Sequence, residues 1–162
     1  MDQTLLTLST TVGKALFAQG YTISTAESCT GGLLCHVLTA ISGASAYVMG
    51  GVIAYDNSIK EGVLGVQAQT LTEHGAVSQE TAHQMADGIR QKFGTDIGLS
   101  TTGVAGPTGG TAMKPVGLVW IGISLPGETL AIECHFPGSR LEIMQATVFE
   151  ALTQLLNKLV PQ

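Results

Sequence analysis

Segments with helical and with strand-like patterns alternate along most of this 162-residue sequence, and this alternation limits the fold more than any other feature. Apolar residues recur at helical spacing from Leu5 to Leu16, and Gly20 follows as a helix stop. Further helices are predicted over 31–40, 57–64, 79–93 and 139–159, and strands over 21–26, 47–55, 97–102, 116–124 and 129–136. The last two strands are joined by Leu-Pro-Gly-Glu, which is typical of a hairpin. This pattern predicts an α/β fold, a three-layer α/β/α domain with a mixed, mostly parallel sheet, in which the apolar segment 47–55 is a buried strand.

The length and composition fit a single domain over residues 1–162. At 44% hydrophobic residues the chain has ample material for a core. Only 12% of the residues are charged, about half the usual share. Because so few charges are available to cover the surface, we expect a homo-oligomer.

The charges and cysteines narrow the class of protein. The net charge is −5, and the seven basic residues form no run, so we expect no nucleic-acid partner. No segment approaches the roughly 20 apolar residues of a membrane span, and the N-terminus lacks the pattern of a signal peptide. Three cysteines make an odd number without a disulfide framework. We therefore expect a cytoplasmic protein with reduced thiols and no membrane partner.

Three segments combine glycines and polar residues where predicted strands end, which is where ligands bind in open α/β sheets. The first, 25–32, reads Thr-Ala-Glu-Ser-Cys-Thr-Gly-Gly. Ser28 would lie on the turn as a nucleophile, with the N–H groups of the following helix beside it to stabilise an anion. Alternatively, Ser28 or Thr30 only caps that helix. Cys29 is either a second nucleophile or, as we favour, a buried thiol.

The second segment, 55–60, reads Tyr-Asp-Asn-Ser-Ile-Lys. Asp56 or Asn57 can cap a short helix, which places Lys60 in its first turn. The helix dipole there opposes a positive charge and lowers the lysine pKa, as a general base requires. The alternative is a solvated surface lysine.

The third segment, 101–110, has four glycines within eight residues, and Lys114 follows shortly after. It matches neither a Walker loop nor the dinucleotide-binding fingerprint. Its N–H groups could close on an anion, or the segment could be a structural turn. We expect a substrate phosphate to be held partly by this loop and partly by a cation. Arg140 is the candidate cation, because an arginine at a helix start is disfavoured unless it meets an anion; alternatively it pairs with Glu142 or another acid.

A metal site is not expected. Cys35-His36 and Cys134-His135 are adjacent pairs, and the sequence has no Cys-x-x-Cys motif. The sequence also gives no reason to expect a cofactor.

Taken together, the order and spacing of the three segments resemble the C-terminal domain of the competence/damage-inducible CinA family over essentially the whole chain. The resemblance implies the three-layer fold and the activity of several members, which hydrolyse the carboxamide of nicotinamide mononucleotide (NMN) to nicotinate mononucleotide and ammonia in pyridine-nucleotide salvage. It implies Ser28 as nucleophile, Lys60 as its base and Tyr55 as a helper. The chain resembles the stand-alone form of the family rather than its two-domain form. The expected substrate-binding residues are Cys29, Thr30, Gly31, Thr102, Gly103, Ala105, Gly106, Gly109, Gly110 and Arg140.

Three hypotheses follow from the sequence. The first is a serine amidase acting on NMN. The second is a non-catalytic nucleotide- or phosphate-binding module of the same family, and the third is a subunit whose main role is assembly with a partner. The presence of both Ser28 and Lys60 favours the amidase, because a binding module would need neither.

Overall fold

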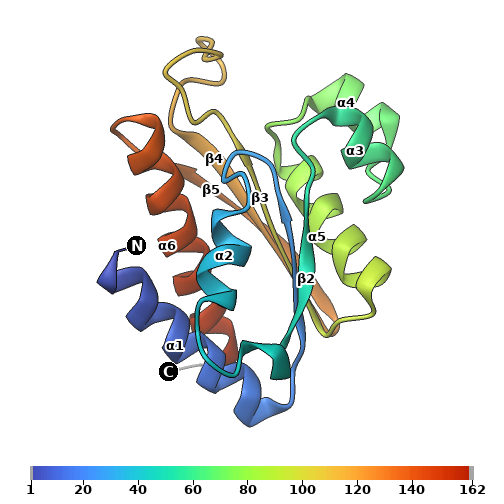
Figure 1. The fold of residues 1–162 in the computed structure, drawn as a ribbon. Coiled ribbons are helices and arrows are strands. Elements are labelled where there is room, and N and C mark those ends of the chain that lie inside the picture. Colours follow the sequence, from blue (N-terminus) through green and yellow to red (C-terminus); the bar gives the residue numbers. More distant parts are fainter. Residues whose placement is uncertain (1, 161–162) are drawn as a thin grey trace.

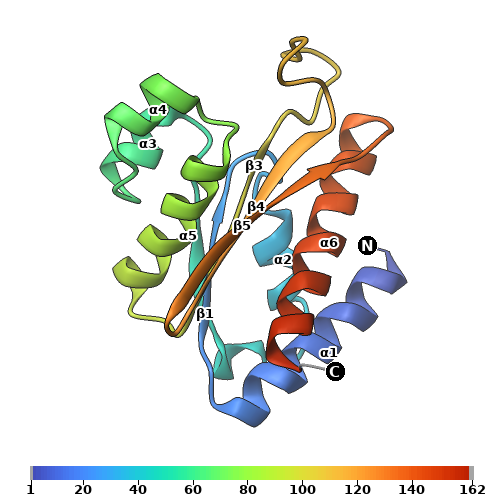
Figure 2. The same ribbon diagram turned by 180° about the vertical axis from the view of Figure 1, so that it is seen from behind.

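The computed structural model describes residues 2–160, which form one five-stranded sheet between two layers of helices (Figures 1 and 2). The strands are β1 (Ile23–Glu27), β2 (Val48–Ile53), β3 (Ile97–Gly103), β4 (Leu118–Leu125) and β5 (Glu128–His135). The helices are α1 (Gln3–Gln19), α2 (Leu33–Thr39), α3 (Asn57–Gly62), α4 (Ala68–His74), α5 (Gln79–Phe93) and α6 (Arg140–Leu159), with a 3₁₀ turn η1 at Ala44–Ala46.

The sheet has the order β2-β1-β3-β4-β5. β1 pairs in parallel with β2 and β3, β4 is antiparallel to β3, and β5 is antiparallel to β4. Only β4 therefore runs against the other strands. Helices α1, α2 and α6 cover one face, and α5 with α3 and α4 lies on the other (Figure 1). This arrangement confirms the predicted α/β/α domain with a mixed, mostly parallel sheet.

Local signals in the sequence set the helix ends. Gly20 takes the left-handed conformation that ends α1, and Ser78 Oγ accepts a hydrogen bond from the Thr81 N–H at the start of α5, as predicted. At the start of α6, Glu142 Oε2 accepts hydrogen bonds from both the N–H and the hydroxyl of Ser139. The Gly20 N–H donates to carbonyl oxygens of the last turn of α1, and the Ser78 and Glu142 side chains accept from N–H groups at the helix starts, so each cap pairs groups that a helix end would otherwise leave unpaired.

One prediction about the fold is wrong, and one helix was missed. The strand within 47–55 is not buried: β2 is the edge strand, and its side chains alternate, with Met49 and Ile53 about half exposed (49% and 55%). Helix α4 was not predicted, because its seven residues contain only two apolar side chains, Ala68 and Leu71, and it fully buries only Thr70.

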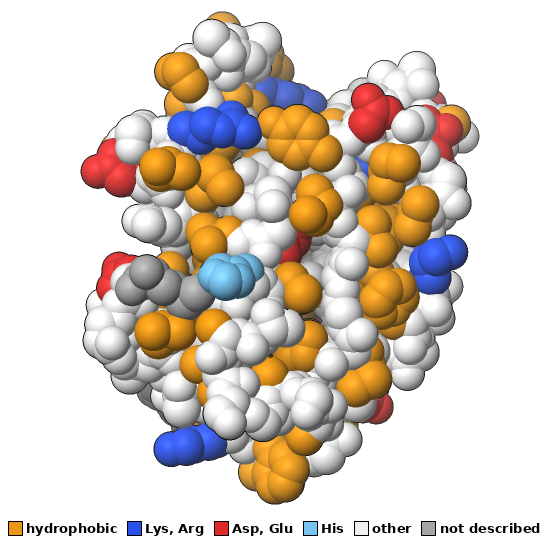
Figure 3. All heavy atoms as spheres, in the orientation of Figure 1, with side chains coloured by type: hydrophobic (Ala, Val, Ile, Leu, Met, Phe, Trp, Pro, Cys, Tyr) orange, Lys and Arg blue, Asp and Glu red, His pale blue; other side chains and the backbone are white. Residues whose placement is uncertain are grey.

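The surface carries few charges. Figure 3 shows one face of the molecule with scattered Lys, Arg, Asp and Glu side chains among hydrophobic and uncharged ones. None of the helices within residues 2–160 is long and apolar enough to cross a membrane.

The strand register brings the ends of three strands together. Glu27, the last residue of β1, pairs with Ile53 in β2 and with Thr101 in β3. Ala54, Ser28 and Thr102 therefore follow one another, in this order, across the carboxyl edge of the sheet. This is the edge where the three segments singled out in the sequence meet.

Candidate active site

A cleft of about 200 Å³ opens at this edge of the sheet. It contains residues from all three segments, together with the start of α6 and the connection between α4 and α5. Its lining residues are Ser28, Cys29, Tyr55, Asn57, Lys60, Ala76, Val77, Thr102, Gly103, Ala105 and Arg140.

Lys60 extends from α3 into the base of the cleft, and only 1% of its surface is exposed. Its Nζ lies 3.2 Å from Ser28 Oγ and donates hydrogen bonds to the carbonyl oxygens of Ala54 (2.9 Å) and Tyr55 (3.2 Å). Lys60 is therefore not a solvated surface lysine. A neutral amine at this position could keep both carbonyl contacts and turn its lone pair to Ser28.

Burial lowers the pKa of Lys60 below its usual value, whereas the negative charge of Asp56 acts in the opposite direction. Burial is thus the main cause, rather than the helix dipole invoked from the sequence. The Asp56 carboxylate accepts from the Ser58 N–H and so caps α3. Within residues 2–160, no carboxylate lies close enough to Lys60 for an ion pair.

The turn that carries Ser28 is held by a buried carboxylate. Glu27 accepts hydrogen bonds from the backbone N–H groups of Gly32, Leu34 and Cys35, which form the start of α2. These N–H groups are therefore not free to stabilise an anion, contrary to the expectation from the sequence. Thr30 is turned away from the cleft, and its hydroxyl donates to Glu27 Oε2.

Arg140 joins the second and third segments at the mouth of the cleft. Its guanidinium donates to the carbonyl oxygen of Gly106 (2.9 Å) and to the hydroxyl of Tyr55 (3.0 Å). Arg140 forms no ion pair within the described part of the chain, and Glu142 is engaged by Ser139 instead. Within residues 2–160, Arg140 is therefore not paired with an acid, and its anion-binding role stays a prediction.

The sequence profile of the CinA C-terminal domain matches residues 5–159. The chain belongs to the CinA C-terminal domain family. The CinA-like protein of Gemmatimonas aurantiaca is 51% identical over 134 residues, which are 83% of this chain and 31% of that relative. The CinA-like protein of Rippkaea orientalis is 48% identical over 157 residues, which are 95% of this chain and 38% of that relative. The chain thus spans about a third of the length of these curated relatives.

Solved CinA structures share the whole fold. The competence/damage-inducible protein CihA from Agrobacterium tumefaciens matches with a TM-score of 0.94 and 42% identity, over 97% of this chain and 98% of that chain. A CinA superfamily protein from Klebsiella pneumoniae matches with a TM-score of 0.93 and 36% identity, over 96% of this chain and 97% of that chain. The three-layer fold is therefore that of the CinA C-terminal domain.

The cleft of this CinA domain contains some of the predicted binding residues and leaves others outside. Cys29, Thr102, Gly103 and Ala105 line it, and Gly106 is tied to it through Arg140. The remaining four predicted residues do not line the cleft: Thr30 lies buried beneath it, and Gly31, Gly109 and Gly110 are exposed outside it.

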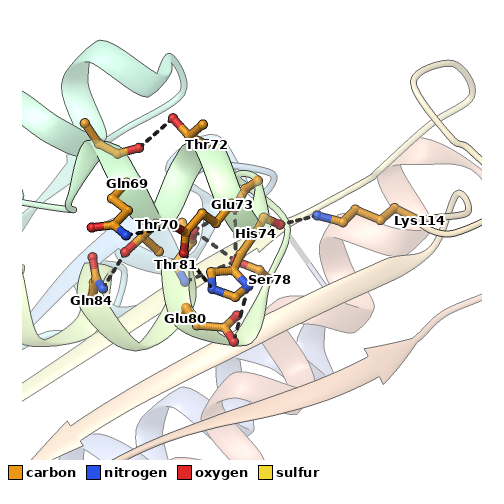
Figure 4. Close-up of polar contacts among 12 residues, drawn as sticks. Gln69, Thr70, Thr72, Glu73, His74, Ser78, Glu80, Thr81, Gln84 and Lys114 are labelled. Atoms are coloured by element: carbon orange, nitrogen blue, oxygen red, sulfur yellow. Dashed lines mark hydrogen bonds and ion pairs between the residues drawn. The ribbon is translucent and has the colours of Figure 1, made fainter.

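Two predicted candidates are used differently in this CinA domain. Burial raises the pKa of the Cys29 thiol to about 12, so it holds no thiolate near neutral pH and is a poor nucleophile. Lys114 donates to the carbonyl oxygen of His74 at the end of α4 (Figure 4). It therefore attaches the glycine-rich loop to the α4–α5 side of the cleft and does not line the cleft itself.

Four residues of the site were missed in the sequence. Glu27 is part of the first segment, and an acid between Ala26 and Ser28 at the end of a strand was a usable signal. Asn57 stands in the second segment and lines the cleft next to Tyr55. Ala76 and Val77 carry no chemically distinctive group, so only the folded structure identifies them.

Proposed function

We propose that this CinA domain is an amidohydrolase that converts NMN to nicotinate mononucleotide and ammonia, in pyridine-nucleotide salvage. The observation that carries the proposal is the 3.2 Å contact between Ser28 Oγ and the buried Nζ of Lys60, within an open cleft. A hydroxyl beside a lysine with a lowered pKa is the pairing that activates a serine nucleophile. Membership of the CinA family supports a domain of this type, and the choice of substrate rests on the resemblance of its three segments.

In the proposed reaction, neutral Lys60 accepts the proton of Ser28 Oγ as that oxygen attacks the carboxamide carbon. The C–N bond of the tetrahedral intermediate then breaks, and the ammonium of Lys60 returns the proton to the leaving nitrogen. Ammonia departs and leaves a nicotinate ester on Ser28. Water gives a proton to Lys60 and attacks this ester, which frees nicotinate mononucleotide and returns the proton to Ser28.

The tetrahedral intermediate carries a negative charge on the former carbonyl oxygen. A hydrogen-bond donor must stabilise this charge, and the N–H groups that already donate to Glu27 are not available for it. The backbone N–H of Cys29 follows the nucleophile directly, and Cys29 lines the cleft. In enzymes with a nucleophile on a strand–turn–helix, the N–H after the nucleophile commonly serves this role. In this proposal the backbone N–H of Cys29 donates a hydrogen bond to the oxyanion.

The proposal predicts that the purified chain releases ammonia from NMN in the presence of EDTA. Ser28 and Lys60 supply both the nucleophile and the proton transfer, so no divalent cation is needed for either step. The measurement is ammonia and nicotinate mononucleotide formed over time, with and without chelator. A rate lost to EDTA and restored by a divalent cation would contradict the mechanism. Saturable NMN binding without product would instead support the non-catalytic binding module.

The charge of the cleft predicts how the substrate phosphate is bound. Lys60 and Arg140 line the cleft, and no Asp or Glu of residues 2–160 does. A charged hydrogen bond contributes about 1.5–3 kcal/mol, so Arg140→Met should lower kcat/KM for NMN roughly 10- to 100-fold. Nicotinamide riboside, which lacks the phosphate, should be a poor substrate. Its kcat/KM should change little in Arg140→Met.

A matched control removes a charge elsewhere. Lys92→Met removes a positive charge from the exposed last turn of α5 and should leave kcat/KM unchanged for both NMN and nicotinamide riboside. If Arg140→Met lowered kcat/KM equally for NMN and nicotinamide riboside, Arg140 would not be the phosphate ligand.

A further inference from the structure

Glu27 is the last residue of β1, and only 1% of its surface is exposed. Its Oε2 accepts hydrogen bonds from the Thr30 hydroxyl (2.7 Å) and from the N–H groups of Gly32 and Leu34 (both 3.0 Å). Its Oε1 accepts from the Cys35 N–H (2.8 Å). Four donors from the chain that follows Ser28 therefore converge on one buried carboxylate.

Two glycines make this convergence possible. Gly31 and Gly32 both adopt positive φ angles (59° and 100°), which lets successive N–H groups turn toward one point. A Cβ at Gly32 would also lie only 3.0 Å from Ile53 Cδ1. The glycine pair of the first segment is thus explained by the path of the chain around Glu27, without any contact to substrate.

The same network holds Ser28 from both sides. The Ser28 N–H donates to the Thr101 carbonyl oxygen (2.9 Å), and the Ser28 carbonyl oxygen accepts from the Gly31 N–H (3.2 Å). The hydroxyls of Thr30 and Thr101 lie 2.7 Å apart, which links the turn to β3. Glu27 touches neither Ser28 Oγ nor Lys60 Nζ through a hydrogen bond within residues 2–160, so it acts on them only through the turn.

We propose that Glu27 is a positioning residue that fixes the turn over residues 28–32 and so keeps Ser28 Oγ beside Lys60 Nζ. The kinetic part of this inference rests on the proposed amidase function. A purely structural role would lower the stability of the domain without changing the reactivity of Ser28 in the folded protein. The experiment must therefore distinguish a change in the reactivity of Ser28 in the folded protein from a change in the fraction of protein that is folded.

The first variant is Glu27→Gln, which keeps the shape of the side chain. Its amide retains one acceptor oxygen but places an NH₂ donor against the N–H donors of α2, so the turn should shift. Because a displacement of about 1 Å can cost about 100-fold in rate, we expect kcat for NMN to fall about 10- to 100-fold. KM should stay within about threefold, and the pH at which the rate rises should move little, since Lys60 Nζ keeps its hydrogen bonds to the carbonyl oxygens of Ala54 and Tyr55.

A second variant and a control remain informative if Glu27→Gln does not fold. Thr30→Val removes the hydroxyl between Glu27 and Thr101 and should lower kcat with unchanged KM, whereas loss of a substrate contact would raise KM. Asp96→Asn is the matched control. Asp96 accepts from the N–H and hydroxyl of Thr22 before the start of β1, at the opposite edge of the sheet. It should lower the Tm without affecting kcat or KM.

The reactivity of Ser28 gives a readout that does not depend on NMN. Labelling by phenylmethylsulfonyl fluoride, followed by intact mass with Ser28→Ala as the blank, should be at least about tenfold slower in Glu27→Gln than in the wild type at equal folded fraction. If wild-type protein is labelled but releases no ammonia from NMN, the proposed function fails while the labelling comparison still tests Glu27. Folded Glu27→Gln with wild-type kcat and labelling rate would overturn the inference, as would a rise in KM alone.

Discussion

Ser28→Ala is expected to abolish the hydrolysis of NMN, with kcat lowered by about a thousandfold or more. The substitution removes only the nucleophilic oxygen. The hydroxyl of Thr30 cannot replace it, because that hydroxyl donates to Glu27 beneath the cleft. The protein should keep its fold, since the Ser28 N–H still reaches Thr101 and Lys60 Nζ still has two carbonyl partners.

The measurement is ammonia release under saturating NMN, together with the Tm of the variant. Ser45→Ala serves as a control, because it removes an exposed hydroxyl in η1, outside the cleft. It should match the wild type in both rate and Tm. Turnover near the wild-type level in Ser28→Ala would refute the nucleophile assignment and with it the proposed mechanism.

The fold was largely predictable because its signals are local. The spacing of apolar residues and the caps at Gly20 and Ser78 act within one helix, so they can be read without the tertiary structure. The position of a strand within a sheet is not local. Segment 47–55 is apolar enough for a central strand, yet within residues 2–160 β2 pairs with β1 alone and forms the edge of the sheet.

The candidate site was predictable where its parts lie near strand ends, and less so where distant segments combine. The strand register explains why Ser28 and the segment of Lys60 meet. The contact between Arg140 and Tyr55 joins residues 85 positions apart, and only the packing of α6 against the sheet brings them together.

The role of Glu27 shows why spacing alone misled the interpretation of the first segment. A strand–turn–helix sequence correctly indicates N–H groups at the start of α2 that have no partner within the helix. Whether an anion from outside or a side chain of the same chain binds them depends on the φ angles of Gly31 and Gly32. In this chain Glu27 takes the N–H groups that the sequence had suggested for the substrate.

The rate of NMN hydrolysis is expected to rise with pH through the pKa of Lys60. Only the neutral amine can accept the proton of Ser28, so the enzyme is inactive where Lys60 is protonated and gains activity as it loses that proton. Burial lowers the pKa of Lys60 from an ordinary value of about 10.4. The midpoint of kcat against pH should therefore lie below that value. A midpoint at or above it would contradict the role of Lys60 as base.

Lys60→Arg is the sharpest test of this role, and we expect it to lower kcat by about a thousandfold or more. Arginine keeps the positive charge and much of the length, but it does not deprotonate in proteins. The change therefore removes the base while retaining the electrostatic attraction for an anionic substrate. KM for NMN should change much less than kcat, because in this proposal the substrate phosphate is bound by Arg140 and not by Lys60.

The outcome must be read on folded protein, since a guanidinium is bulkier than an ammonium in this buried position. Lys60→Met is the companion variant, because it fills similar space without a charge, and it should be equally inactive. Loss of the base makes both variants slow, whereas loss of charge alone would make only Lys60→Met slow. If Lys60→Arg kept most of the wild-type kcat, Lys60 would be an electrostatic anchor for the substrate or the oxyanion. The base would then have to be another group in the cleft, and the hydroxyl of Tyr55 beside Arg140 would be the first to test.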